Sequence, residues 1–297
     1  MLEAVERLAG ARDLLDRATV ILGRDLRADD TADGYRSTVV AQRALFVAGV
    51  ASARALQHAG VSVDAVAGHS VGTYAAAVIA GAIDFVTALC LVDRRAHLMA
   101  RAFPAGYGMG AIGGLSERDV AELVAENTSS AAPIFTTNVN APDQIAVAGA
   151  LPAIARVIAA ARTRGARTAR SLDVCVPSHT PLMHDVARAL GRECASCTIR
   201  AAQVLYATNV GGRLTRDADL IRRDLGCGVS RPVRWADATR ALYERGVRLF
   251  VEMRPGSNLA DLATYAFSDA RAVALEIAGI DSVVALAQRF SERQQKL

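Results

Sequence analysis

Hydrophobic positions recur along this chain with two different spacings. Apolar residues that repeat every three or four positions predict helices at 3–22, 41–59, 71–81, 85–102, 181–191 and 236–246. Short apolar or β-branched runs between them predict strands at 64–70, 203–210 and 247–253. Helices that alternate with short buried strands are typical of an α/β domain, so we expect a mainly parallel sheet.

The middle of the chain follows a different order. The pattern predicts strand, helix, two strands, helix and strand at 109–115, 116–127, 133–140, 144–150, 151–165 and 166–174. This β-α-β-β-α-β order is that of ferredoxin-like units. We therefore predict a large α/β domain formed by 1–103 and 174–297, with a small ferredoxin-like subdomain, 104–173, inserted into it.

Composition narrows the class of protein. The chain has 297 residues, of which 52% are hydrophobic and 22% charged, so it can bury a substantial core. The net charge is +4, but the arginines are scattered and often alternate with acids. No basic block of the kind that binds nucleic acid is present, so we expect no nucleic-acid partner.

The cysteines and the N-terminus indicate a compartment. Five scattered cysteines argue against a disulfide framework, and the C-x-x-C pair of Cys194 and Cys197 lacks the further ligands of a metal site. Acids begin at Glu3, so the first residues do not form a signal peptide, and no run reaches about 18 apolar residues. We expect a cytoplasmic protein with no membrane partner and no metal.

The sequence G-H-S-V-G at 68–72 lies where a predicted strand meets a predicted helix. In that context the G-x-S-x-G pattern is typical of a serine nucleophile, here Ser70, on a strained turn. The N–H of Val71 at the helix start could stabilise a developing oxyanion. The alternative interpretation is a tight turn without chemistry.

A serine nucleophile needs a base, and five histidines are available. His179 lies between Pro177 and Pro181 in a rigid loop after a strand, where α/β sheets present catalytic residues, although it could be a turn residue. His184 is the second candidate, and His69 should point away from Ser70. No histidine follows position 184, which argues against an ordinary esterase or lipase.

The predicted helix 85–102 carries two adjacent arginines, Arg94 and Arg95. Neighbours on a helix differ in direction by about 100°, so one can face solvent while the other faces the core or a pocket. A buried guanidinium needs an anionic partner. That partner is either a structural carboxylate or a carboxylate of the substrate.

These features together resemble the malonyl-CoA:acyl-carrier-protein transacylase family over nearly the whole chain. The resemblance is carried by the motifs at 68–72, 95–99, 138–142, 177–183, 232–235 and 250–256. It implies a hydrolase-like large domain. The segments YRSTVVAQRALFVAGV and AFPAGYGMGAIGGL resemble in particular the epsilon subunit of malonate decarboxylase, which loads malonyl onto the carrier protein of the decarboxylase.

The resemblance implies a mechanism. Ser70 would attack malonyl-CoA with His179 as base, Arg95 would hold the malonyl carboxylate, and Asn138 and Asn140 would line the pocket. In the family, a main-chain carbonyl orients the histidine. The malonyl group would pass to the prosthetic-arm thiol of an acyl carrier protein, with ping-pong kinetics and no bound cofactor. In the decarboxylase setting, other subunits of that complex would also be partners.

The chain departs from the family pattern. Members open with a strand and a G-Q-G-x-Q turn whose glutamine helps to form the oxyanion hole, whereas this chain starts with a predicted helix. We expect that first strand to be missing, by truncation or by genuine loss, and loss of one oxyanion donor typically costs about 10²–10³ in rate. Thr73 replaces a frequent glutamate and Arg254 replaces a glycine.

Three alternatives stay open. The same transfer could serve fatty-acid or polyketide synthesis. The chain could be a truncated, inactive subunit that only docks to a carrier protein. It could also be a serine hydrolase that releases free malonate.

Overall fold

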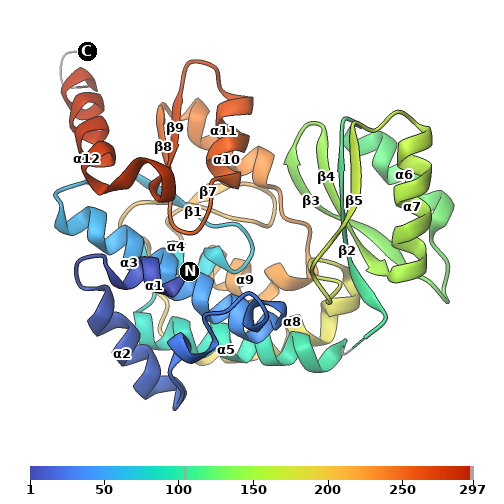
Figure 1. The fold of residues 1–297 in the computed structure, drawn as a ribbon, viewed down its shortest axis with the longest axis horizontal. Helices are drawn as coiled ribbons and strands as arrows, with labels where there is room; N and C mark the ends of the chain where they lie inside the picture. Colours follow the sequence, from blue (N-terminus) through green and yellow to red (C-terminus); the bar gives the residue numbers. More distant parts are fainter. Residues whose placement is uncertain (104, 295–297) are drawn as a thin grey trace.

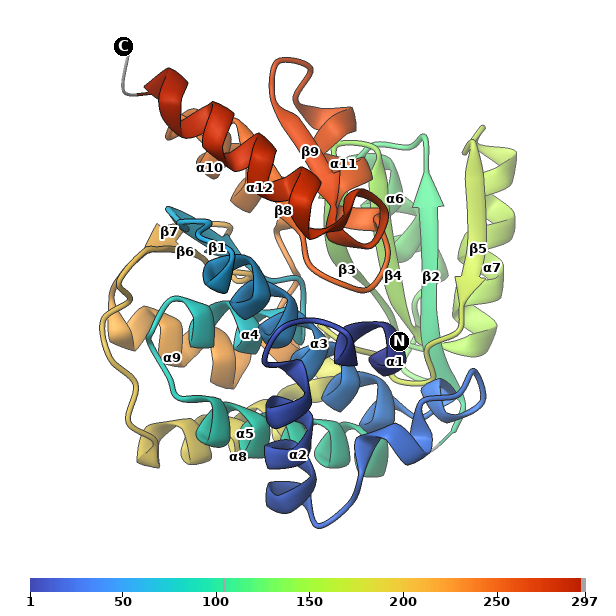
Figure 2. The ribbon, with the colours of Figure 1, turned by 60° about the vertical axis from the view of Figure 1, so that its left-hand side comes forward.

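The computed structural model describes residues 1–103 and 105–294. Figure 1 shows a helix-rich large part beside a smaller body of four strands with two helices on its outer face. Figure 2 shows the C-terminal helix α12 (Leu275–Gln294) crossing above the large part. The mixture of helices and sheets confirms the predicted α/β class.

The large part is mainly helical. Its helices before the insertion are α1 (Leu2–Glu6), α2 (Ala11–Leu22), α3 (Thr38–His58), α4 (Gly72–Ile79) and α5 (Phe85–Ala102). Those after it and before α12 are α8 (His184–Ser196), α9 (Ala218–Cys227), α10 (Trp235–Glu244) and α11 (Asn258–Ala266). The predicted helix 3–22 was wrong as a single element, because the chain turns at Gly10, with a φ of 73°, and forms α1 and α2 instead. The other helices predicted for this part are present, with bounds that differ by a few residues.

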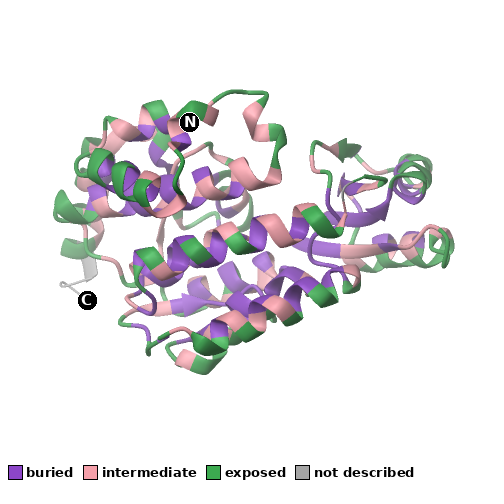
Figure 3. Cartoon of the chain, turned by 90° about the horizontal axis from the view of Figure 1, so that it is seen from below, coloured by how far each residue is buried: buried purple, intermediate pink, exposed green. Residues whose placement is uncertain are grey.

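Helix α3 forms the centre of the large part. It packs against α2, α4 and α5, and its side chains Phe46, Val47 and Val50 are fully buried. By length and composition α3 could cross a membrane, so the expectation that no segment of the chain is long and apolar enough to do so was wrong. Most of α3 is buried inside the protein, as is usual for a core helix. Figure 3 shows exposed residues on the outer rims of both parts.

The sheets of the large part are short. Strand β1 (Ala65–Ala67) pairs in parallel with β6 (Leu205–Ala207), which pairs antiparallel with β7 (Leu214–Thr215). A separate parallel pair is formed by β8 (Leu249–Glu252) and β9 (Arg271–Ala274). The three predicted strands are present but shorter than predicted, and the parallel pairing is divided between two small sheets.

The small body has the order of a ferredoxin-like sheet. Its elements are β2 (Tyr107–Gly113), α6 (Glu117–Asn127), β3 (Ile134–Ala141), β4 (Gln144–Ala150), α7 (Leu151–Thr163) and β5 (Thr168–Leu172). The strands are antiparallel in the order β3-β4-β2-β5, over a core that includes Ile112, Val147 and Ile154. The domain boundaries at 104 and 173 stay a prediction.

The turn from β1 into α4 is tightly packed. A Cβ on Gly68 would lie 2.1 Å from the carbonyl carbon and oxygen of Gly72, whereas a Cβ on Gly72 would meet nothing within 4 Å. Ser70, between them, has a φ of 55°, in the left-handed region that non-glycine residues rarely adopt. Gly68 therefore lets the start of α4 press against the end of β1 and hold Ser70 in this strained conformation.

We predict that the two glycines of this turn respond differently to substitution. Gly68→Ala should lower the free energy of unfolding by about 2–3 kcal/mol, because the new methyl group meets rigid backbone. Gly72→Ala, the matched control, should change it by less than about 1 kcal/mol, since the site is open and alanine favours helices. Chemical denaturation measures both values, and equal destabilisation by the two variants would contradict this account of the turn.

Candidate active site

The structure brings three predicted site residues together from distant parts of the chain. The Ser70 hydroxyl oxygen lies 2.7 Å from Nε2 of His179 and 3.1 Å from Nη2 of Arg95. Ser70 lies in the turn between β1 and α4, Arg95 comes from α5, and His179 from the loop before α8. A nucleophile, a base and a cation thus meet at one point.

Main-chain carbonyls fix the state of His179. Its Nδ1 lies 2.8 Å from the carbonyl oxygen of Gly228 and 3.2 Å from that of Arg231. Because both of these partners can only accept, Nδ1 carries the proton, and Nε2 is left to accept from the hydroxyl of Ser70. The imidazole is therefore oriented as a general base without a carboxylate.

The electrostatic surroundings keep His179 neutral. The side chain is 3% exposed and adopts a φ of 63°. Burial and the nearby charge of Arg95 lower the pKa of His179 to about 3, although its carbonyl partners favour the protonated form. At neutral pH the imidazole is therefore ready to accept a proton.

The two adjacent arginines point in different directions, as their spacing predicts. Arg94 is partly exposed and donates to Glu193 at 2.7 Å. Arg95 is only 3% exposed and donates to the side-chain oxygen of Gln42 on α3 and to Ser70. Burial lowers the pKa of Arg95. Within residues 1–103 and 105–294 it has no carboxylate partner, so its charge is available to an anion.

An asparagine that the sequence did not indicate holds the turn at Ser70. The side-chain oxygen of Asn209 accepts from the N–H of Ser70 at 2.8 Å, and its amide nitrogen donates to the carbonyl of Gly68 at 2.5 Å. Asn209 follows β6, whose Ala207 lies opposite Ala67 of β1. The neighbouring strand ends could have suggested this contact, but only once their pairing was known.

A buried carboxylate supports that asparagine. Asp224 accepts from the N–H groups of Asn209 at 3.1 Å and Val210 at 2.8 Å, and from the hydroxyl of Tyr206 at 2.9 Å. Burial raises the pKa of Asp224. Asp224 and Asn209 both line the small cavity at Ser70, so this network connects the nucleophile to α9.

The remaining predicted residues do not line the cavity at Ser70. The N–H of Val71 has no hydrogen-bond partner among the described residues, so it is available to an oxyanion. Asn140 contacts His69 at 3.0 Å, and the side-chain oxygen of Asn138 is buried without a hydrogen-bond partner among the described residues. Neither asparagine lines the cavity at Ser70, so their pocket role stays a prediction. His184 is exposed and does not line that cavity.

The described residues do not form a set of metal ligands. Within the part of the chain that the structure describes, no three histidine, cysteine, aspartate or glutamate side chains are arranged to hold a metal ion. Cys194 and Cys197 are free thiols, and that of Cys197 lies 3.2 Å from the carbonyl oxygen of Glu193.

The site at Ser70 can support attack by the serine hydroxyl on an acyl group that carries a negative charge.

Comparisons with known proteins agree with this geometry. The sequence pattern of the acyl transferase domain family matches residues 13–289. The malonyl CoA-acyl carrier protein transacylase of Escherichia coli K12 is 36% identical over 250 residues, which cover 82% of this chain and 81% of the relative.

Two solved structures are similar throughout. The malonyl CoA-acyl carrier protein transacylase of Coxiella burnetii has a TM-score of 0.88 and 31% identity, covering 94% of this chain and 89% of that one. A malonyl-transacylase in complex with its type II polyketide-synthase acyl-carrier protein has a TM-score of 0.87 and 31% identity, covering 94% and 91%. The chain belongs to the acyl transferase domain family, in which it stands with the malonyl CoA-acyl carrier protein transacylases.

Proposed function

We propose that this protein transfers a malonyl group from malonyl-CoA, through an ester on Ser70, to the prosthetic-arm thiol of an acyl carrier protein. One observation carries the proposal. The Ser70 hydroxyl lies 2.7 Å from a neutral imidazole and 3.1 Å from a buried guanidinium without a carboxylate partner among the described residues. The imidazole activates the nucleophile, and the guanidinium receives the carboxylate at the far end of the acyl group.

In the first half-reaction Ser70 attacks the thioester carbonyl, and its proton passes to Nε2 of His179. The carbonyl oxygen becomes an oxyanion, and the N–H of Val71, which has no partner among the described residues, would stabilise it. The carbon–sulfur bond then breaks, and the proton on His179 goes to the departing CoA thiolate. In the second half-reaction the carrier thiol gives its proton to His179 and attacks the ester. Ser70 recovers its proton as the malonyl thioester forms.

The carrier protein and the pathway belong to the proposal. The similar transacylase solved with its acyl-carrier protein supports a carrier-protein partner here. The motifs at 35–50 and 102–115 favour malonate decarboxylase as the setting, with other decarboxylase subunits as partners, while fatty-acid or polyketide synthesis is the alternative. Rates of transfer to the carrier protein of each pathway distinguish them. We place the reaction in the cytoplasm, which the five free thiols support.

The first prediction from the proposed activity concerns the acyl-enzyme intermediate. Incubation with radiolabelled malonyl-CoA should label the protein covalently, and Ser70→Ala should abolish the label. The exposed Ser62→Ala variant is the control and should be labelled normally. Absence of label even at high protein concentration would sink the transferase, and carrier binding without labelling would favour a docking subunit. Rapid release of free malonate without carrier protein would favour a hydrolase.

The second prediction concerns acyl selectivity. Arg95→Ala should lower kcat/KM for malonyl-CoA by about 100-fold, because two charge-assisted hydrogen bonds are lost. Its preference should shift toward acetyl-CoA, which needs no cation. Arg94→Ala removes an exposed arginine paired with Glu193 and should leave selectivity unchanged. If Arg95→Ala kept the preference for malonyl, the carboxylate would bind elsewhere.

The third prediction concerns pH. Because the pKa of His179 is lowered from 6.5 to about 3, kcat/KM for acylation should stay level from pH 8 to about pH 5. A histidine with an ordinary pKa would instead lose about tenfold per pH unit below 6.5. Arg95→Gln removes a nearby positive charge and should move the acid limb to higher pH, whereas Arg94→Gln should not. A wild-type rate that falls through pH 6.5 would contradict this view.

The same shift affects stability. The unfolded chain binds a proton at position 179 below pH 6.5, but the folded chain does so only near pH 3. The contribution of neutral His179 is therefore complete above pH 6.5 and is lost as the pH falls toward 3. Denaturation of His179→Gln should show a smaller loss of stability over this range than the wild-type protein.

A further inference from the structure

A second cavity lies away from Ser70, between α2 and α3. It has a volume of about 380 Å³ and shares no lining residue with the cavity at Ser70. Its α3 residues begin at Ala51, nine positions after Gln42, so they lie about 14 Å further along the helix than the residue that contacts Arg95. Nothing in the proposed acyl transfer uses this cavity.

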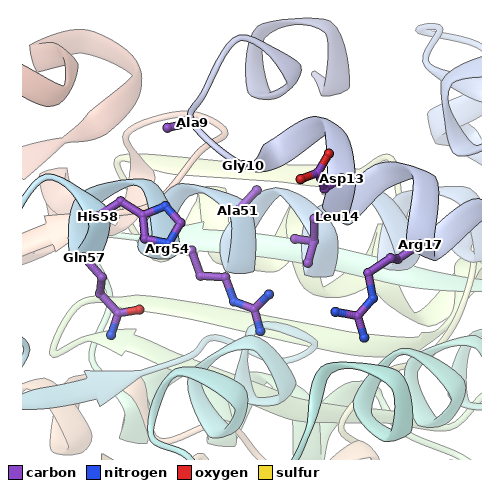
Figure 4. A pocket seen from close by; sticks show the side chains of 9 residues that line it. All are labelled: Ala9, Gly10, Asp13, Leu14, Arg17, Ala51, Arg54, Gln57 and His58. Carbon is purple, nitrogen blue, oxygen red and sulfur yellow. The ribbon is translucent and has the colours of Figure 1, made fainter.

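Two guanidinium groups enter the cavity from facing helices. Arg17 comes from α2 and Arg54 from α3, and Figure 4 shows both side chains extending in the same direction, toward the lower part of the view. Across residues 1–103 and 105–294, neither side chain forms an ion pair or donates a hydrogen bond. By contrast, several arginines in the first 58 residues do pair with a carboxylate: Arg7, Arg12, Arg24, Arg27 and Arg43.

The charge at this cavity is uncompensated. Burial and the like charge of Arg17 lower the pKa of Arg54, which is half-buried with its guanidinium carbon 5.8 Å from the centre of the Phe85 ring. Asp13 is the one acid among the lining residues, and in Figure 4 its carboxylate points away from both arginines. His58 adds a further nitrogen donor at the rim. An anion between the two guanidinium groups would relieve their repulsion.

We propose that this cavity, the α2–α3 arginine pocket, binds the phosphate monoester group of a small organic molecule. Two planar guanidinium groups present several N–H donors that match the oxygens and the double charge of such a group. The volume is in the range of small-molecule pockets, and Leu14 and Ala51 give it an apolar wall against which an organic body can lie.

Calorimetry with phenyl phosphate as the probe tests this proposal. Wild-type protein should bind it with a Kd of about 1 mM or tighter at low salt. Arg17→Ala and Arg54→Ala should each weaken binding by about tenfold. Arg36→Ala is the matched control, because Arg36 is exposed, unpaired among the described residues and outside the cavity. Unfolding curves of the variants should match that of the wild type.

Several outcomes would overturn the proposal. These are no binding at about 10 mM, binding by the Arg17→Ala and Arg54→Ala variants as tight as that of the wild type, or displacement of phenyl phosphate by malonate as effectively as by inorganic phosphate. The result is independent of acyl transfer. Ser70→Ala should bind phenyl phosphate like the wild type, and Arg17→Ala and Arg54→Ala should still form the acyl-enzyme.

Discussion

A positive charge buried without a counter-ion is the constraint on which this molecule is built. Arg95 is almost fully excluded from solvent, and within the described residues only neutral groups, Gln42 and Ser70, accept its hydrogen bonds. Such a charge destabilises the protein without substrate, because no anion compensates for the hydration that the guanidinium loses on burial. Burial, together with this same charge, lowers the pKa of His179. The charge of Arg95 thus adds to the burial that keeps the base neutral, and it creates a demand for an anionic acyl group.

The other residues of the site hold Ser70 and His179 in place beside Arg95. Ser70 and His179 both have positive φ values, which cost free energy unless the surroundings enforce them. Asn209 bonds on both sides of the turn at Ser70, and Asp224 holds Asn209. On the other side, the carbonyl of Gly228 fixes the imidazole. Short strands suffice for the large part, because polar contacts between chain segments set the geometry.

Sequence periodicity predicted most of the helices and the β-α-β-β-α-β order, since both depend on local burial, but it missed the turn at Gly10 that divides α1 from α2. The chemistry of Ser70, His179 and Arg95 was also accessible, because each stands in a motif with a local meaning. Asn209 was not, since its contact with Ser70 spans 139 positions and depends on the pairing of β1 with β6. The length of the strands was missed for the same reason, because pairing rather than composition ends them.

The two arginine sites differ in the physical basis of their selectivity. Arg95 is only 3% exposed, so a neutral acyl group leaves its charge with little compensation from solvent, and discrimination is strong. Arg17 is exposed and Arg54 half-buried, so water can solvate both in the empty pocket. An anion that binds there replaces water around the two guanidinium groups, so the free energy of binding is smaller than at Arg95 and sensitive to salt. The burial of Arg95 thus suits it to selecting between acyl groups. The greater exposure of Arg17 and Arg54 suits the α2–α3 arginine pocket to weak, reversible binding of an anion.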